Sequence, residues 1–369
     1  MRRGFPRDVL ETAGKIIDDV RDGGLDAALK YSERLDGEAP REVLIAPRPG
    51  GDPSVVGAAL EAARSLEALY RKLAPPSAVD YYGGVLRTVV WKPVRRAALY
   101  VPARYVSTLV MLAMPAKAAG VEELYVVTPP RGVTGEVLGV AKELGIKAVL
   151  ALGGAHGLAY AAFHLGVDML AGPGGLYVQA AKFLLSQYVG IDGIEGPTEL
   201  VVYAEGVPPE TAARGALAQL EHGPTSFAYV LSTDASLLKG VEEVYKREKT
   251  SSMGPLETRL VSSVEEAVEF IDAVAPEHLE VWGRRDIAYR VRNVGAVSVN
   301  MPSPYLDYVA GISHVLPTGG TARWRGIITP LTFMKAVGIA EAVGEIKLAE
   351  AARRLAQYEG FQFHYRALL

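Results

Sequence analysis

Short apolar runs alternate with helical patterns through most of this sequence, and this alternation limits the fold more than any other feature. Strands are predicted at 85–91, 96–101, 123–129, 147–152, 199–204, 227–233 and 296–300, and helices at 7–35, 55–73, 135–145, 208–221, 235–248 and 263–273. Strands and helices in alternation favour parallel sheets with helices on both faces. We therefore predict an α/β fold with two Rossmann-like parallel-sheet domains, one inserted in the other, and helical N- and C-terminal segments.

The predicted domain boundaries follow from two separate runs of alternation. Residues 1–99 and 198–325 are assigned to the first α/β domain, together with the N-terminal helices, and residues 100–197 to the inserted domain. Residues 326–369 are assigned to a C-terminal helical tail, with a long helical pattern over 336–358. The tail ends in the apolar and aromatic run "YEGFQFHYRALL", so we expect it to pack on a partner subunit.

The composition excludes several classes of protein. The chain has 369 residues, 49% of them hydrophobic, and a formal net charge of −3. A charge this close to neutral gives no electrostatic reason to expect a nucleic acid or an acidic membrane as partner. Because there is no cysteine, any transition metal must be held by His, Asp, Glu or Gln side chains.

Residues 148–167 carry no charged side chain and are long enough to span a bilayer. Gly153, Gly154 and Gly157 interrupt this run, which is better interpreted as a buried strand, a glycine turn and a buried helix. The N-terminus lacks the apolar core of a signal peptide. A cytoplasmic location is therefore expected.

The six histidines direct the search for chemistry. In "VAPEHLEVWG", Glu277 directly precedes His278. The segment is interpreted either as a surface turn or as a site in which both side chains transfer protons. Gln219 and His222 lie three residues apart near the end of a predicted helix, and therefore on one face. That pair is either half of a zinc site or a helix end whose dipole favours histidine.

Loop segments supply further candidates. Asp307 and His314 lie in a stretch rich in glycine and proline, and Glu359 and His364 lie near the C-terminus. Glycine-rich turns at 153–157 ("GGAHG") and 172–175 ("GPGG") each lie between a strand and a helix, where open α/β sheets bind ligands. Neither turn matches the dinucleotide fingerprint G-x-G-x-x-G, so each is a weak nucleotide motif.

Taken together, these segments resemble the histidinol dehydrogenase family over nearly the whole chain. The matching blocks occur in the family's order: "YVP" at 100, "VTPP" at 127, "GPG" at 172, "EGPTE" at 195, "AQLEHGP" at 218, "APEHLE" at 275, "DYVAGISHVLPTGGTAR" at 307 and "EGFQFH" at 359. Several blocks in order are more specific than any one of them. Known members of the family are longer, so this chain resembles a compact version.

The resemblance implies one Zn²⁺ per subunit, NAD as cofactor and L-histidinol as substrate. Zinc would be held by Gln219, His222, Asp307 and His364, and the acid–base pair would be Glu277 and His278. The substrate-binding set would be Thr198, Gln219, His222, His278, Asp307, His314, Glu359 and His364, with Thr198 where the family usually has serine. The family is homodimeric, so the C-terminal tail would bring Glu359 and His364 into the neighbour's site.

The implied reaction oxidises L-histidinol to histidinal and then to L-histidine while two NAD are reduced. The metal would hold the imidazole and the amine of the substrate against the nicotinamide. A histidine such as His278 suits removal of the hydroxyl proton near neutral pH. Glu277 would activate the water that adds to the aldehyde.

Departures from the family pattern cluster at the cofactor. The loop after "YVP" is shorter by about three residues, His156 replaces a glutamine that contacts NAD, and Gly175 replaces an asparagine that does the same; Tyr100 is retained. The preferred interpretation is an NAD-dependent histidinol dehydrogenase that holds NAD somewhat differently. The alternatives are a diverged zinc-dependent protein that binds histidinol or histidine without oxidoreductase activity, and a dehydrogenase of another amino alcohol.

Overall fold

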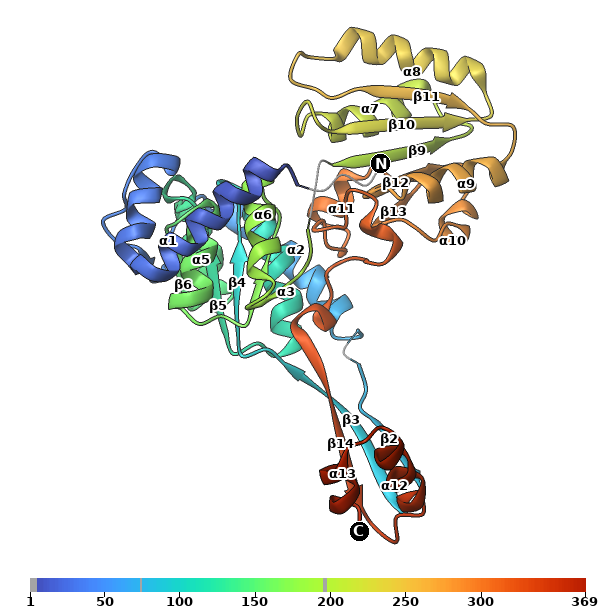
Figure 1. Cartoon of the computed structure of the whole chain (residues 1–369). Helices are drawn as coiled ribbons and strands as arrows, with labels where there is room; N and C mark the ends of the chain where they lie inside the picture. Colours follow the sequence, from blue (N-terminus) through green and yellow to red (C-terminus); the bar gives the residue numbers. More distant parts are fainter. Residues whose placement is uncertain (1–4, 74, 195–197) are drawn as a thin grey trace. The chain divides into compact units, whose positions relative to one another are not determined.

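The computed structural model describes residues 5–73, 75–194 and 198–369 (Figure 1). Residues 195–197 of the predicted "EGPTE" block lie outside this description. The chain forms two units, one of residues 1–73 and 94–333 and the other of residues 74–93 and 334–369. The larger unit contains two parallel sheets, which confirms the predicted α/β class.

The first sheet has the strand order β1-β6-β5-β4-β7-β8. The strands are β1 (Leu44–Ile45), β4 (Arg96–Tyr100), β5 (Glu123–Val127), β6 (Ala148–Leu150), β7 (Met169–Ala171) and β8 (Gly190–Ile191). All neighbours are parallel except β1, which runs antiparallel to β6. The chain crosses from β4 towards β6 on one side and then returns to β7 on the other, so the order reverses between β4 and β7.

Helices cover both faces of this sheet and thereby bury the side chains of its strands. The helices are α3 (Val106–Ala119), α4 (Gly135–Glu143), α5 (Gly154–His164) and α6 (Leu176–Leu185). Residues 148–167, whose length allowed a membrane span, form β6, a turn and α5, as predicted. Among the described residues, none of the helices combines the length and the apolar character needed to cross a bilayer.

The N-terminal helix α1 (Arg7–Tyr31) packs against α5 and α6, and α2 (Pro53–Tyr70) packs against α3. Gly24, in the left-handed region at φ 58°, breaks the helical geometry of α1. These contacts differ from the predicted grouping, which placed residues 1–99 with residues 198–325. The reason is the row of apolar side chains on α1, including Ile16, Ile17 and Val20, which completes the core of the first sheet.

The second sheet is parallel throughout, in the order β11-β10-β9-β12-β13. Its strands are β9 (Glu199–Ala204), β10 (Phe227–Ser232), β11 (Leu256–Leu260), β12 (His278–Trp282) and β13 (Ala296–Val299). Its helices are α7 (Pro209–Leu220), α8 (Ala235–Glu248), α9 (Val264–Val274), α10 (Ile287–Arg290) and α11 (Pro304–Tyr308).

Alternate residues of β9 enter two separate cores, one on each face of this second sheet. Leu200 and Val202 pack with α7 and α8, whereas Val201 and Tyr203 pack with α9 and α10. An apolar run without polar interruption is what a strand covered on both faces requires. The helices and strands predicted from 199 to 273 therefore lie within a few residues of those observed.

The smaller unit is an antiparallel sheet in the order β14-β3-β2, followed by two helices. The elements are β2 (Ala78–Tyr82), β3 (Val85–Pro93), β14 (Met334–Ala342), α12 (Ala349–Tyr358) and α13 (Gln362–Ala367). The helix predicted over 336–358 is wrong in its first half. Residues 334–342 pair with residues 85–93 along their whole length, and partners that distant in the sequence are invisible to a local helical pattern.

Candidate active site

A cluster of polar side chains surrounds the amino ends of β9 and β12, at the edge of the second sheet where α7 ends. His278 begins β12 and Glu277 directly precedes it, while Thr198 directly precedes β9. Gln219 lies in the last turn of α7 and His222 just beyond its end. Asp307 is carried by α11. The strands are adjacent and parallel, so residues that are far apart in the sequence meet at one edge.

Glu277 and His278 are buried, with 8% and 2% of their surfaces exposed. The chain leaves α9 through Ala275 in the left-handed region at φ 54°, then passes Pro276 into β12. This tight turn brings both side chains into the interior. The burial excludes the alternative that "APEHLE" is a surface turn.

The Glu277 carboxylate lies at the centre of a hydrogen-bond network. The hydroxyl of Thr198 donates to Oε2 of Glu277, and the backbone N–H of Glu199 donates to the same oxygen at 3.3 Å. The side-chain amide of Gln219 donates to the Thr198 hydroxyl and lies 3.5 Å from Glu277 Oε2. The other oxygen, Oε1, lies 3.8 Å from His278 Nε2.

The imidazole of His278 lies between two carboxylates. Its Nε2 is 3.8 Å from Glu277 Oε1 and 3.7 Å from Asp307 Oδ1, both longer than a hydrogen bond. Its Nδ1 is buried and makes no hydrogen bond within the described part of the chain. A substrate proton could therefore be taken up without breaking an existing hydrogen bond.

His314 joins the loop of the second sheet to a helix of the first sheet. Its Nδ1 lies 2.8 Å from the backbone oxygen of Asp307, and its Nε2 lies 3.1 Å from the hydroxyl of Thr108 on α3. A carbonyl oxygen only accepts, so Nδ1 carries a proton. When the ring is neutral, Nε2 accepts from Thr108. His314 is thereby fixed beside Asp307.

Burial dominates the electrostatics of this cluster. It raises the pKa of Glu277 to about 8 and that of Asp307 to about 7. It also lowers the pKa of His278 to about 3, with His314 and His222 acting in the same direction. The protein alone thus disfavours charge of either sign here, and an added cation would favour the ionised carboxylates.

Gln219, His222 and Asp307 are the predicted zinc ligands in the larger unit. For Asp307, burial is what raises the pKa of the carboxyl. A mostly buried carboxylate of this kind suits a divalent cation. Within the described ranges no three His, Cys, Asp or Glu side chains form a metal cluster, so the zinc set stays a prediction.

Glu359 and His364 belong to the smaller unit. Glu359 follows the last residue of α12, and His364 lies on α13 with its ring 5.0 Å from that of Phe361. Both side chains are exposed. The assignment of His364 to zinc and of Glu359 to substrate stays a prediction.

The predicted cofactor residues lie at the carboxyl edge of the first sheet. Tyr100 ends β4, and its hydroxyl accepts the N–H of Gly154 at 3.3 Å. Gly175 is exposed at the start of α6, with open space where a Cβ would lie. The reversal of strand order between β4 and β7 falls beside Tyr100, and such a point is where open α/β sheets bind dinucleotides.

The His156 side chain is not exposed at this edge. It is fully buried, and its Nε2 lies 3.0 Å from a carboxylate oxygen of Asp36. A direct contact between NAD and the His156 side chain would therefore require the ring to move. Sequence patterns gave no sign of this pairing, because Asp36 lies 120 residues away in the sequence.

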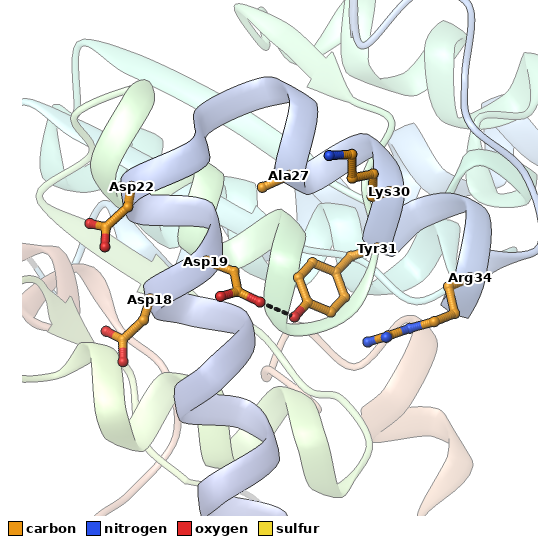
Figure 2. Close-up of a pocket in the computed structure, with 7 residues that line it drawn as sticks. All are labelled: Asp18, Asp19, Asp22, Ala27, Lys30, Tyr31 and Arg34. Atoms are coloured by element: carbon orange, nitrogen blue, oxygen red, sulfur yellow. Dashed lines mark hydrogen bonds between the residues drawn. The ribbon is translucent and has the colours of Figure 1, made fainter.

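A separate groove of about 470 Å³ runs beside the kinked helix α1 (Figure 2). Its lining residues are Asp18, Asp19, Asp22, Ala27, Lys30, Tyr31 and Arg34. The hydroxyl of Tyr31 donates to Asp19 at 2.5 Å, and Lys15 also binds that carboxylate. These groups satisfy one another, and none belongs to the predicted site.

Glu280 was missed from the sequence, although it is fully buried two residues beyond His278. Its carboxylate accepts from the indole N–H of Trp282 at 2.6 Å and from the backbone N–H of Ser303 at 2.8 Å. Gly215 of α7 lies against it, since an added Cβ would come within 2.5 Å. Glu280 thus connects β12 to α7 and to the start of α11, which carries Asp307.

Burial raises the pKa of Glu280 above its usual value. In the unfolded chain this carboxyl ionises at a lower pH, so its ionisation disfavours the folded state as the pH rises between the two pKa values. We expect Glu280→Gln to destabilise the folded state at low pH, because the amide weakens the hydrogen bonds that the Glu280 carboxyl accepts. The loss of stability should become smaller as the pH rises. Urea unfolding of both proteins from pH 4 to pH 8 measures this difference, and a constant difference would contradict it.

Comparison with solved structures first shows which enzymes share this fold. The chain is similar in structure to aldehyde dehydrogenases, including a probable one from Listeria monocytogenes EGD-e (TM-score 0.53, 14% identity, 93% of this chain and 94% of that one). It is much more similar to a histidinol dehydrogenase from Elizabethkingia anophelis (TM-score 0.87, 22% identity, 99% and 92% covered). At these identities the likeness shows the fold alone.

Sequence comparison then gives the family. The profile described as histidinol dehydrogenase matches residues 2–369. A histidinol dehydrogenase from Pyrobaculum aerophilum is 76% identical over 99% of this chain and all of that protein. One from Thermus thermophilus is 36% identical over the whole chain and 96% of that protein. The chain belongs to the histidinol dehydrogenase family, as the quoted motifs predicted, and this is a family of oxidoreductases.

Proposed function

We propose that this chain oxidises L-histidinol through histidinal to L-histidine and reduces two NAD⁺ in the process. The observation that carries the proposal is the buried Glu277–His278 pair, with Thr198, Gln219 and Asp307 around it. The 76% identity to a curated histidinol dehydrogenase supports the choice of substrate. Overall, one water and two NAD⁺ are consumed, and two hydrides leave the same substrate carbon in succession.

In the first oxidation His278 would take the hydroxyl proton while hydride leaves the carbon for NAD⁺. The lowered pKa of His278 keeps its imidazole neutral at physiological pH, as a proton acceptor must be. Within the described part of the chain its Nδ1 has no hydrogen-bond partner, and its Nε2 lies 3.7 and 3.8 Å from carboxylate oxygens, so whichever nitrogen lacks a hydrogen in the neutral ring can receive the proton. The alcohol carbon then becomes an aldehyde.

In the second oxidation the ionised form of Glu277 would accept a proton from water as it adds to the aldehyde. Because burial raises the pKa of Glu277 to about 8, alkaline pH or a nearby cation favours this form. Glu277 would return that proton to the former carbonyl oxygen, and the hydrate would then give a hydroxyl proton to Glu277 and hydride to a second NAD⁺ to become the carboxylic acid. Thr198 and the N–H of Glu199 hold Oε2 of Glu277, which leaves Oε1 directed towards His278. The two reagents therefore face the same space from adjacent positions in the chain.

Gln219, His222 and Asp307 would hold Zn²⁺, with His364 as the fourth ligand. When bound, the ion would supply a positive charge that anchors the imidazole and amine of the substrate. We further propose a cytoplasmic homodimer in which Glu359 and His364 act in the neighbour's site. The smaller unit supports this, because Tyr358 and Phe363 are 90% and 81% exposed, more than an isolated subunit favours.

Removal of the metal tests the zinc assignment. Chelation is expected to abolish NADH formation from histidinol, and added Zn²⁺ should restore it. Elemental analysis should find less than one metal ion per subunit in Asp307→Asn. The control is Asp286→Asn, which changes a surface carboxylate paired with Arg284 and should bind as much metal as the wild type. Full activity in completely metal-free protein would overturn the assignment.

The departures from the family pattern at residues 103, 156 and 175 are the reason for considering a second function. In that case the protein would bind histidinol or histidine without oxidising it. The full burial of His156 favours this alternative only if NAD needs that side chain directly. Steady NADH production from histidinol by the purified protein would exclude a mere binding protein. Metal-dependent histidinol binding without NADH production would instead support one.

A further inference from the structure

The glycine turn at 153–157 is held by a carboxylate from outside the alternating strands and helices. Asp36 is the last residue of the short π-helical turn that follows α1 (Ser32–Asp36). Its Oδ2 accepts the backbone N–H of Gly153 at 2.9 Å and also lies 3.0 Å from His156 Nε2. One oxygen atom therefore fixes both ends of the Gly153–His156 segment.

The donors can be assigned by their chemistry. An ionised carboxylate only accepts, so Nε2 of His156 carries a proton. Burial by itself would raise the pKa of Asp36, but the contacts with His156 and Gly153 outweigh burial and the pKa lies below its usual value. The Asp36 side chain is 11% exposed and that of His156 is fully buried.

The packing around this contact leaves little freedom. A Cβ on Gly153 would come within 2.5 Å of Asp36, so only glycine allows the carboxylate to approach this closely. The plane of the His156 ring is inclined by 23° to that of Tyr31, with centroids 6.3 Å apart. The hydroxyl of Ser32 also donates to Asp36, at 3.3 Å.

The same turn contacts the proposed cofactor residue. The N–H of Gly154, next to Gly153, donates to the hydroxyl of Tyr100 at the carboxyl end of β4. Asp36 and Tyr100 thus hold adjacent residues of the turn from two different segments of the chain. Any shift of Gly153 would move the Tyr100 hydroxyl at the edge where the strand order reverses.

We infer that Asp36 is a positioning residue for NAD, acting through Gly153 and His156 to fix the glycine turn beside Tyr100. The inference rests on the proposed NAD-linked function. It assigns His156 an inward role in place of the direct cofactor contact that its position predicted. It also makes the cofactor site depend on the end of the N-terminal helix.

Direct titration with NADH tests this inference without relying on turnover. Asp36→Ala is expected to raise the dissociation constant for NADH by about 10-fold, the equivalent of about 1.4 kcal/mol. Asp36→Asn should have a smaller effect, because its oxygen still accepts from Gly153. His156→Gln should weaken NADH binding less than Asp36→Ala does, because its amide can still donate to Asp36.

The matched control is Asp168→Ala. Asp168 accepts two backbone N–H groups, from Arg95 and Arg96 at 2.9 and 3.0 Å, at the opposite edge of the same sheet. Its loss should lower the thermal midpoint without weakening NADH binding. In steady state, Asp36→Ala should raise the KM for NAD and change the KM for histidinol much less.

The outcomes separate the two proposals. Unchanged NADH binding in folded Asp36→Ala, or equal weakening in Asp168→Ala, would overturn the role of Asp36 while leaving the proposed function intact. A wild-type protein that neither binds NADH nor forms it would overturn both. If Asp36→Ala does not fold, Asp36→Asn carries the test, with amide exchange at Gly153 and Gly154 as the second measurement.

Discussion

His278→Ala is expected to lower NADH formation from histidinol by about 10²- to 10⁴-fold, the usual contribution of a positioned general base. The effect should fall on the alcohol step, because that step removes a hydroxyl proton. His278 is 2% exposed, so external buffer cannot readily replace it. The measurement is NADH formation from histidinol and, separately, from histidinal supplied as substrate.

A histidine elsewhere provides the control for His278. His164 on α5 donates to the backbone oxygen of Val20 at 2.9 Å. His164→Gln retains a donor and should leave both oxidations unchanged. If His278→Ala were to slow the histidinal reaction as much as the histidinol reaction, with metal content unaltered, His278 would serve both steps and the assignment to the alcohol step would be wrong.

Glu277→Gln is expected to give a loss of similar size in the second oxidation. The amide has nearly the shape of the carboxylate and its oxygen can still accept from Thr198 and from the N–H of Glu199, but it cannot take a proton from water. The variant should therefore release histidinal, which a carbonyl trap detects. It should form close to one NADH per histidinol where the wild type forms two.

Glu257→Gln, an exposed substitution on β11, is the matched control and should retain the full yield of NADH. Thermal unfolding and bound metal of Glu277→Gln should match those of the wild type, since the hydrogen-bond network persists. Equal loss in both oxidations would indicate that Glu277 organises the site and does not act on water. A normal yield of two NADH would remove Glu277 from the second step.

Local pattern predicted most of the larger unit because its strands are buried on both faces. The continuous apolar run of β9, Glu199–Ala204, and the amphipathic helix α8, Ala235–Glu248, were predicted at the observed bounds. Long-range pairing was beyond local pattern. Residues 334–342 resemble a helix in composition, yet nine backbone pairs with residues 85–93 place them in a strand.

The site also contains residues that the sequence predicted and one that only the structure revealed. Motif order alone selected Thr198, Gln219, Glu277, His278, Asp307 and His314, and the structure brings these six together around the amino ends of two adjacent strands. Sequence patterns could not find Glu280, which resembles any other charged residue in a strand. Its importance comes from burial between α7, β12 and α11.

By itself, the sequence determined the α/β class and the family, and it predicted the site residues, because hydrophobic periodicity and motif order can be recognised from neighbouring residues. Only the tertiary structure decided the burial, the pKa shifts and the contacts of those residues. It placed Glu277 and His278 in the interior, where loss of water raises one pKa and lowers the other. It also buried His156 against Asp36, because a buried imidazole N–H requires an acceptor and this one comes from 120 residues earlier in the chain.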